Sequence, residues 1–110
     1  MQLKIKVTPR DVRIALERHK KGWTMESPLT VALEREGYKG AVHSTNLKWP
    51  AMWAYNAAGT RLMKIALSRR AMSTLSLWWA NKLTSLTEPI TFFLDAETAL
   101  DEPHFPGYTQ

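Results

Sequence analysis

The sequence contains few side chains of the kinds and spacings that carry out catalysis. Its three histidines, His19, His43 and His104, have no second histidine or carboxylate at a metal-binding spacing such as i, i+4 on one helix. The chain of 110 residues has no cysteine, which excludes disulfides, thiolate metal ligands and cysteine nucleophiles. Because no glycine-rich phosphate-binding motif and no serine nucleophile elbow occurs either, we expect no enzyme activity, no cofactor and no metal site.

Paired carboxylates stand out toward the C-terminus, as Asp95 with Glu97 and Asp101 with Glu102. Asp95 and Glu97 would point to the same side if a strand continued to residue 97, and that geometry suits a shared cation. We expect solvated charge there instead, in an acidic tail with a short helical turn at 96–101.

The formal net charge of +5 is unevenly distributed along the chain. Basic residues dominate residues 1–22 and 60–84, whereas residues 85–110 hold five acidic residues and no basic one. One interpretation is a solvated basic surface, and the other is an electrostatic surface for nucleic acid or an acidic partner. The acidic end, folded back onto the basic face, would weaken that surface. The candidate nucleic-acid contacts are Lys4, Lys6, Arg10, Arg13, Arg18, Lys20, Lys21, Arg69 and Arg70.

Aromatic residues form a second group of candidates, because five tryptophans in 110 residues is a high content. Three aromatic residues fall within residues 49–55, and another tryptophan precedes a lysine by one helical turn, which would place the lysine over the indole ring. These residues either pack in the core and at a sheet edge or form an exposed binding surface, since tryptophan and tyrosine carry much of the energy at protein interfaces. The candidate protein-binding residues are Trp49, Trp53, Tyr55, Trp78 and Lys82.

Periodic apolar residues and capping signals predict the elements that position these side chains. Alternating apolar residues indicate strands, and a capping residue followed by proline indicates a helix start, as at Thr8 and Ser27. The predicted strands are residues 2–7, 40–47, 52–56, 61–67 and 89–95, and the predicted helices are residues 9–20, 28–36 and 69–84. In the last helix an apolar stripe assigns Trp79 to the core, together with Met72, Leu75, Leu83 and Leu86.

This order of elements predicts an α+β fold with a mainly antiparallel sheet of about four strands and two or three helices packed on one face. We expect a single domain at 1–95, followed by an acidic, proline-containing tail at 96–110. The N-terminus lacks a continuous apolar signal region, and no apolar stretch approaches the roughly 20 residues of a membrane span. We therefore expect a cytoplasmic protein without membrane contact.

Four short segments of the sequence resemble a loose group of short bacteriophage and prophage proteins without an assigned function. They are the IKVT strand at 5–8, the Ser27-capped helix start, the Ser68-capped helix that contains tryptophan, and the EPITF strand at 88–92. Many members of that group have cysteine where this chain has Ser27, so a cysteine-dependent role would not carry over. The resemblance implies a viral or mobile-element origin and the same α+β layout, and it offers no active site.

Together these observations favour a non-enzymatic, phage-type binding protein that inhibits or modulates a host protein or nucleoprotein. It would act in the cytoplasm of an infected or lysogenic bacterium. One alternative is a basic accessory or regulatory protein that binds nucleic acid, although the second predicted helix lacks base-reading groups apart from Thr30 and Arg35. A further alternative is a small virion or assembly component, which would differ in requiring self-association.

Overall fold

A computed structural model of the protein describes residues 1–22, 26–43 and 51–98. These residues form three helices and five strands, which confirms the predicted α+β class, and all five strands join one sheet, for which about four strands were expected. In chain order the elements are β1 (Gln2–Val7), α1 (Pro9–Lys20), α2 (Pro28–Arg35), β2 (Lys39–His43), β3 (Ala51–Tyr55), β4 (Leu62–Ala66), α3 (Arg69–Trp79) and β5 (Ile90–Thr98).

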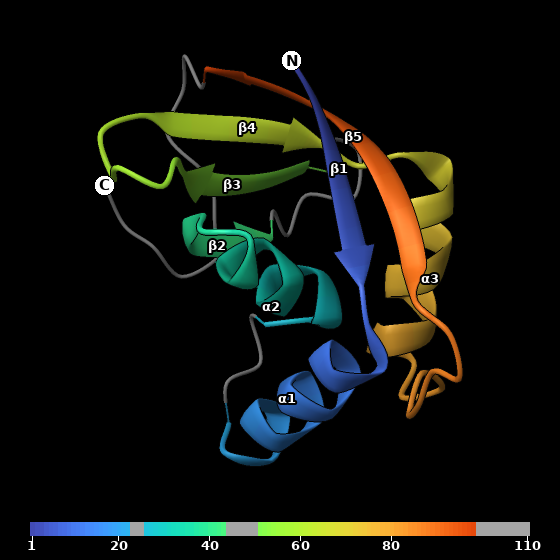
Figure 1. Ribbon diagram of the computed structural model, residues 1–110. Helices are drawn as coiled ribbons and strands as arrows, with labels where there is room; N and C mark the ends of the chain where they lie inside the picture. The colour runs from blue at the N-terminus through green and yellow to red at the C-terminus, as the bar shows by residue number, and fades with distance from the viewer. Residues whose placement is uncertain (23–25, 44–50, 99–110) are drawn as a thin grey trace.

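The five strands form one antiparallel sheet in the order β1-β5-β4-β3-β2. The sheet is curled, and Figure 1 shows β5 bending from its course beside β1 toward β4. Residues 90–95 of β5 pair with β1, and residues 95–98 pair with β4. The first and last strands of the described chain are therefore neighbours, and β1 and β2 are the two edges of the sheet.

The inner face of this curled sheet holds the hydrophobic core. Strict alternation in β1 buries Leu3, Ile5 and Val7, as the sequence predicts. Helix α2 lies against this face, and every residue from 28 to 33 is buried. Leu29 of α2 and Leu75 of α3 belong to one core cluster with residues of β1 and β5, so the helices cover the inner face as predicted.

The three helices begin where their capping residues predict. Thr8 and Asp11 exchange hydrogen bonds at the start of α1, with 3.2 Å from the Asp11 N–H to the Thr8 Oγ1 and 2.8 Å from the Thr8 N–H to the Asp11 carboxylate. Ser27 caps α2, and Ser68 accepts a bond of 3.1 Å from the Ala71 N–H at the start of α3. Each cap satisfies backbone donors that a helix cannot satisfy internally.

Helix α3 ends at Trp79, so the prediction of a helix to residue 84 is wrong. Asn81 adopts a left-handed backbone with φ of 59°, and the Lys82 N–H donates back to the Leu77 carbonyl over 2.8 Å. The Asn81 N–H also donates to the Trp78 carbonyl over 3.0 Å. These bonds form a Schellman end, in which asparagine replaces the usual glycine because its short polar side chain tolerates this conformation.

The early end of α3 also corrects the predicted apolar stripe. The predicted stripe included Leu83 and Leu86, which lie beyond the helix and therefore do not define its face. The buried residues of the helix are Ala71, Leu75 and Trp78 at the spacing i, i+4, i+7. Trp78 is consequently 6% exposed and Trp79 is 43% exposed, the reverse of the predicted burial.

Strand β5 continues to Thr98, so the described part of the predicted helical turn at 96–101 is strand instead. The strand continues because both of its sides have partners: β4 pairs with residues 95–98, and the Ala96 N–H donates to the Met1 carbonyl over 2.7 Å. The predicted boundary between domain and tail at residue 95 therefore falls inside β5. Residues 99–110, and residues 44–47 of the predicted 40–47 strand, lie outside the described part of the chain.

Candidate functional site

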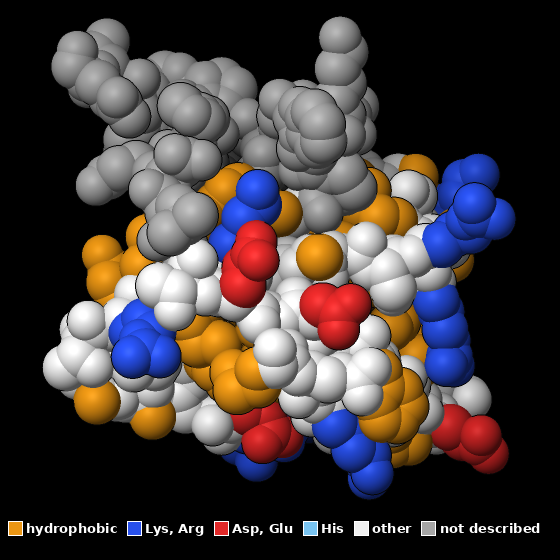
Figure 2. Space-filling model, turned by 90° about the horizontal axis from the view of Figure 1, so that it is seen from above, with side chains coloured by type: hydrophobic (Ala, Val, Ile, Leu, Met, Phe, Trp, Pro, Cys, Tyr) orange, Lys and Arg blue, Asp and Glu red, His pale blue; other side chains and the backbone are white. Residues whose placement is uncertain are grey.

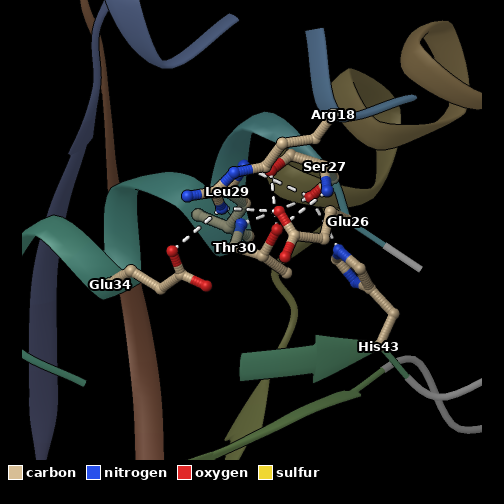
Figure 3. A network of polar contacts seen from close by, with 7 residues as sticks. All are labelled: Arg18, Glu26, Ser27, Leu29, Thr30, Glu34 and His43. Carbon is tan, nitrogen blue, oxygen red and sulfur yellow. Dashed lines mark hydrogen bonds and ion pairs between the residues drawn. The ribbon is translucent and has the colours of Figure 1, made fainter. Parts of the chain in front are cut away.

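A buried polar network lies where α2 begins and β2 ends. The Ser27 Oγ accepts hydrogen bonds from the backbone N–H groups of Leu29 and Thr30, over 3.2 and 3.4 Å. The Ser27 N–H donates to the Thr30 Oγ1 over 2.8 Å, so the two side chains form a reciprocal capping box. Figure 3 shows His43 reaching from the end of β2 toward this turn.

The His43 imidazole completes this network as a neutral base. Its Nε2 lies 2.6 Å from the Ser27 Oγ. Because the Ser27 oxygen already accepts two backbone N–H groups, its own O–H is assigned as the donor to Nε2. The imidazole proton is then on Nδ1, which is buried without a hydrogen-bond partner among the described residues. Burial lowers the pKa of His43 from 6.5 to about 4, so the ring is uncharged at neutral pH.

A serine hydroxyl donating to a neutral histidine is the arrangement that activates a nucleophile in hydrolases. Here Ser27 is fully buried, and its oxygen is occupied as the cap of α2. A substrate therefore has no access to the hydroxyl in this conformation. The pair acts as a structural connection between α2 and β2, and the Trp79 indole packs edge-on against His43 with ring centroids 5.6 Å apart.

The sequence alone does not indicate this pair, because Ser27 and His43 are 16 residues apart. The capping pattern identifies Ser27 as a helix start, and the strand pattern identifies His43 only as a strand residue. The one sequence signal is the period-two pattern of the strand, which places His43 on the same face as Ala41. In the structure both residues are buried, and Val42 between them is half-buried. The partner of the histidine depends on how α2 crosses the sheet, which local patterns do not specify.

Two arginines bind an excess of carboxylates beside this network. Arg18 of α1 pairs with Glu26 over 2.6 Å and with Glu34 over 2.9 Å, and Figure 3 shows it reaching across to α2. The side-chain hydrogen bond with Glu26 is the largest cause of the raised pKa of Arg18. Arg18, one of the predicted nucleic-acid contacts, is therefore held by internal ion pairs.

Arg35, at the opposite end of α2, is also held by two carboxylates. It pairs with Asp11 over 3.2 Å and with Glu36 over 3.2 Å, and it donates to the Lys6 carbonyl at the outer edge of β1. The side-chain hydrogen bond with Asp11 raises the pKa of Arg35. Asp11 is buried, so this pair also compensates a carboxylate that would otherwise be costly to bury.

The two arginines thus bind four carboxylates. Within residues 1–22, 26–43 and 51–98 the lysines and arginines without an ion pair are Lys4, Lys6, Arg10, Arg13, Lys20, Lys21, Lys39, Arg61, Lys64, Arg69, Arg70 and Lys82. The carboxylates without an ion pair in the same ranges are Glu17, Glu88, Asp95 and Glu97. These twelve cations and four carboxylates have a net charge of +8, whereas the two paired arginines and their four carboxylates together have a net charge of −2.

Three of these cations converge on one segment of β5. On the outer face of the sheet Lys4 pairs with Phe93 and Lys6 pairs with Thr91, and both lysines are exposed. From the other side of the strand, Arg70 of α3 donates to the Thr91 carbonyl over 3.3 Å. Arg70 also lies 5.8 Å from the ring of Phe92, which is buried, whereas Phe93 is 57% exposed on the outer face with the two lysines. We call Lys4, Lys6, Arg70, Thr91 and Phe93 the β1–β5 surface.

The charge changes sign further along the same strand. Asp95 and Glu97 are exposed on the outer face of β5, and Glu97 pairs across the strands with Lys64. In the view from above, Figure 2 shows some acidic side chains near the middle of the face and others at its lower edge, among lysine and arginine side chains. The two carboxylates do point to one side, as the sequence suggests for a strand that reaches residue 97. The described residues nevertheless contain no group of three or more metal-binding side chains.

The remaining predicted nucleic-acid contacts are spread over two helices. Arg10, Arg13, Lys20 and Lys21 are exposed on α1 or directly after it, and Arg69 is exposed at the start of α3. A helix of 12 residues such as α1 is about 18 Å long, so the two ends of α1 do not share one compact site. The β1–β5 surface brings Lys4 and Lys6 together on one open face, whereas Arg10 and Arg18 line a pocket that also contains Asp11 and Glu34.

The predicted protein-binding residues are divided by the structure. Trp53 and Trp78 are each 6% exposed, which corrects their assignment to an exposed surface, whereas Tyr55 and Lys82 are exposed. Trp49 lies outside the described residues. The cation that lies over the Trp53 ring is Lys64, at 5.8 Å from the ring centroid. Lys82 follows the end of α3, so the predicted helical pairing with Trp78 does not form.

Trp53 is buried, although its position in β3 alternates with those of Met52 and Ala54, which face inward. Trp78 is buried in a second cluster of hydrophobic residues. That cluster contains Ala15 of α1, Val31 of α2 and Leu83. Sequence reasoning missed it because its members come from four separate segments.

Two further findings concern the described part of the chain and its similarity to known proteins. None of its helices has the length and apolar character needed to cross a membrane. Comparison of the chain with protein-family models, with curated proteins and with solved structures found no match.

Proposed function

We propose that the protein binds nucleic acid through its free cations and catalyses no reaction. The observation that carries this proposal is the distribution of ion pairs. Arg18 and Arg35 each pair with two carboxylates, and Lys4, Lys6 and Arg70 form no ion pair with a described residue. Unpaired lysines and arginines on a protein surface attract phosphates, and they release condensed counterions on binding.

The β1–β5 surface supports this choice over the protein-binding function that the sequence favours. That function relied on the aromatic segment 49–55 and on Trp78; Trp53 and Trp78 are buried, and Tyr55 is exposed. The cationic candidates Lys4, Lys6 and Arg70 remain accessible on adjacent strands and at a helix start. The exposed cations therefore favour a polyanionic ligand.

The test is a fluorescence anisotropy titration of labelled DNA and RNA oligonucleotides with the full chain. The proposal predicts binding at roughly 50 mM salt that weakens steeply by 200 mM, with a slope of about 0.7 to 0.9 log units for each phosphate contacted. Absence of binding to both nucleic acids at the lower salt concentration would contradict it. Binding that does not change with salt would also contradict it.

A protein partner is the second candidate function, and a different observation favours it. Leu77 and Trp79 are 48% and 43% exposed near the end of α3. Tryptophan is among the residues that most often anchor protein interfaces. A phage-type modulator of a host protein would use them in place of the buried indoles that the sequence suggested.

The second candidate is tested by affinity purification from nuclease-treated bacterial lysate. A protein that is recovered with the wild type and lost with Trp79→Ser, while the fold is unchanged by circular dichroism, would support a protein partner. Equal recovery by both forms would exclude Trp79 as the anchor. The nuclease treatment separates direct protein binding from binding through shared nucleic acid.

A further inference from the structure

The exposed ring of Phe93 is part of the β1–β5 surface, although an aromatic ring is not needed to attract phosphates. The ring is 57% exposed in the middle of a nine-residue strand. Its cross-strand partner is Lys4, and Lys6 lies diagonally on the same face. A lysine directly opposite a phenylalanine on an open sheet face leaves the ring available for stacking and places a cation within reach of the same ligand.

We infer that the ligand of this surface is a single strand, with one base stacked on Phe93 and its phosphates held by Lys4 and Lys6. This inference rests on the proposed function and specifies its ligand. In a duplex the faces of the bases are covered by their neighbours, so an exposed phenyl ring has nothing to stack on. In a single strand the base faces are free, and stacking on an aromatic side chain stabilises binding regardless of sequence.

The spacing of the two lysines fits this arrangement. Lys4 and Lys6 are two residues apart on one face of β1, which separates them by about 7 Å along the strand. Their ammonium groups therefore reach different phosphates of one chain. Arg70 does not share the outer face with Phe93: it donates to the Thr91 carbonyl from α3 and lies 5.8 Å from the ring of Phe92, which points into the core.

The acidic end of the same face limits the path of the strand. Asp95 is the next outward residue of β5 after Phe93, and Glu97 follows it. Their carboxylates repel phosphates, so the strand crosses β1 and β5 at the end where Lys6 and Thr91 pair. Duplex reading by α2 is excluded because residues 28–33 of that helix are buried against the sheet.

The experiment compares Phe93→Leu with the wild type in binding a labelled oligonucleotide of about 12 nucleotides, alone and annealed to its complement. Leucine keeps an apolar side chain but cannot stack. We expect the wild type to bind the single strand more tightly than the duplex. We expect Phe93→Leu to lose affinity for the single strand by about tenfold, which corresponds to one lost base–aromatic contact.

Tyr55→Leu is the matched control, because Tyr55 is also an exposed aromatic residue of a strand but lies on β3, away from β1. It should bind the single strand as the wild type does. Thermal unfolding of each variant verifies that the fold is kept. A Phe93→Trp variant should bind at least as tightly as the wild type, since indole also stacks.

The outcomes separate this inference from the function on which it rests. Equal affinity of Phe93→Leu and the wild type for the single strand would overturn the stacking inference. Tighter binding to duplex than to single strand would overturn it as well, and in both cases salt-dependent nucleic-acid binding would still stand. Absence of binding to either form at low salt would overturn the proposed function and the inference together.

Discussion

The Ser27–His43 network and the β1–β5 surface differ in how their polar groups are satisfied. In the network, serine and threonine oxygens, backbone N–H groups and a neutral imidazole are bonded to one another out of solvent. On the surface, Lys4 and Lys6 face solvent without an anionic partner in the described chain. The first region has the polar chemistry of an active site but no access, and the second has access but no catalytic group. Residue type alone therefore does not identify a functional site; accessibility and pairing do.

Protonation of His43 at low pH should disrupt the buried network, and it should have the largest effect on stability of the changes considered below. The pKa of His43 is about 4 in the folded protein and 6.5 in the unfolded chain, so the unfolded chain takes up the proton first. Stability from this group is complete above pH 6.5 and is lost as the pH falls toward 4, by about 3 kcal/mol in total. Urea unfolding between pH 7.5 and 4 measures the loss. A His43→Phe variant, which has no titrating ring, should lack this part of the pH dependence.

Removing the serine hydroxyl should have the next largest effect. Ser27→Ala removes a helix cap and leaves the buried Nε2 of His43 without its donor, so we expect a loss of about 2 to 3 kcal/mol. Ser68→Ala is the matched control, because Ser68 caps α3 through one backbone bond and contacts no histidine in the described residues. It should cost about 1 kcal/mol. Equal losses in the two variants would show that the bond to His43 contributes nothing.

The difference between these two serines also marks how far the sequence predicts the structure. Thr8, Ser27 and Ser68 predict helix starts correctly because a cap depends on neighbours within three residues. The alternation in β1 likewise predicts its buried face. The second role of Ser27 depends on a residue in another element, so no local pattern contains it.

The errors of the sequence-based predictions have the same origin. The burial of Trp78 and the exposure of Trp79 depend on the turn at Asn81, which ends α3 and removes Leu83 from the helical stripe. Arg18 has the same side chain as the free arginines, and only the approach of α2 brings Glu26 and Glu34 to it. The cations of the candidate site are predictable from composition, whereas their separation into paired and free groups requires the fold.

Substitutions on the β1–β5 surface should leave the stability almost unchanged. Lys4, Lys6 and Phe93 are exposed, and neither lysine forms an ion pair with a described residue. We expect Lys4→Gln, Lys6→Gln and Phe93→Leu each to change the free energy of unfolding by less than about 0.5 kcal/mol. Urea unfolding at pH 7 checks this. A loss of several kcal/mol in any of them would show that the surface contributes to folding and would weaken its assignment as a binding site.

The most direct test of the account is the salt dependence of single-strand binding in two double variants of equal charge. Lys4→Gln with Lys6→Gln removes two proposed phosphate contacts, whereas Lys39→Gln with Lys82→Gln removes two exposed lysines from other parts of the surface. The account predicts that the first pair reduces the slope of log affinity against log salt by about 1.4, at about 0.7 for each contact, and that the second pair leaves it unchanged. An equal reduction in both variants would contradict a defined site on β1 and β5, and would show that the protein attracts nucleic acid through its net charge alone.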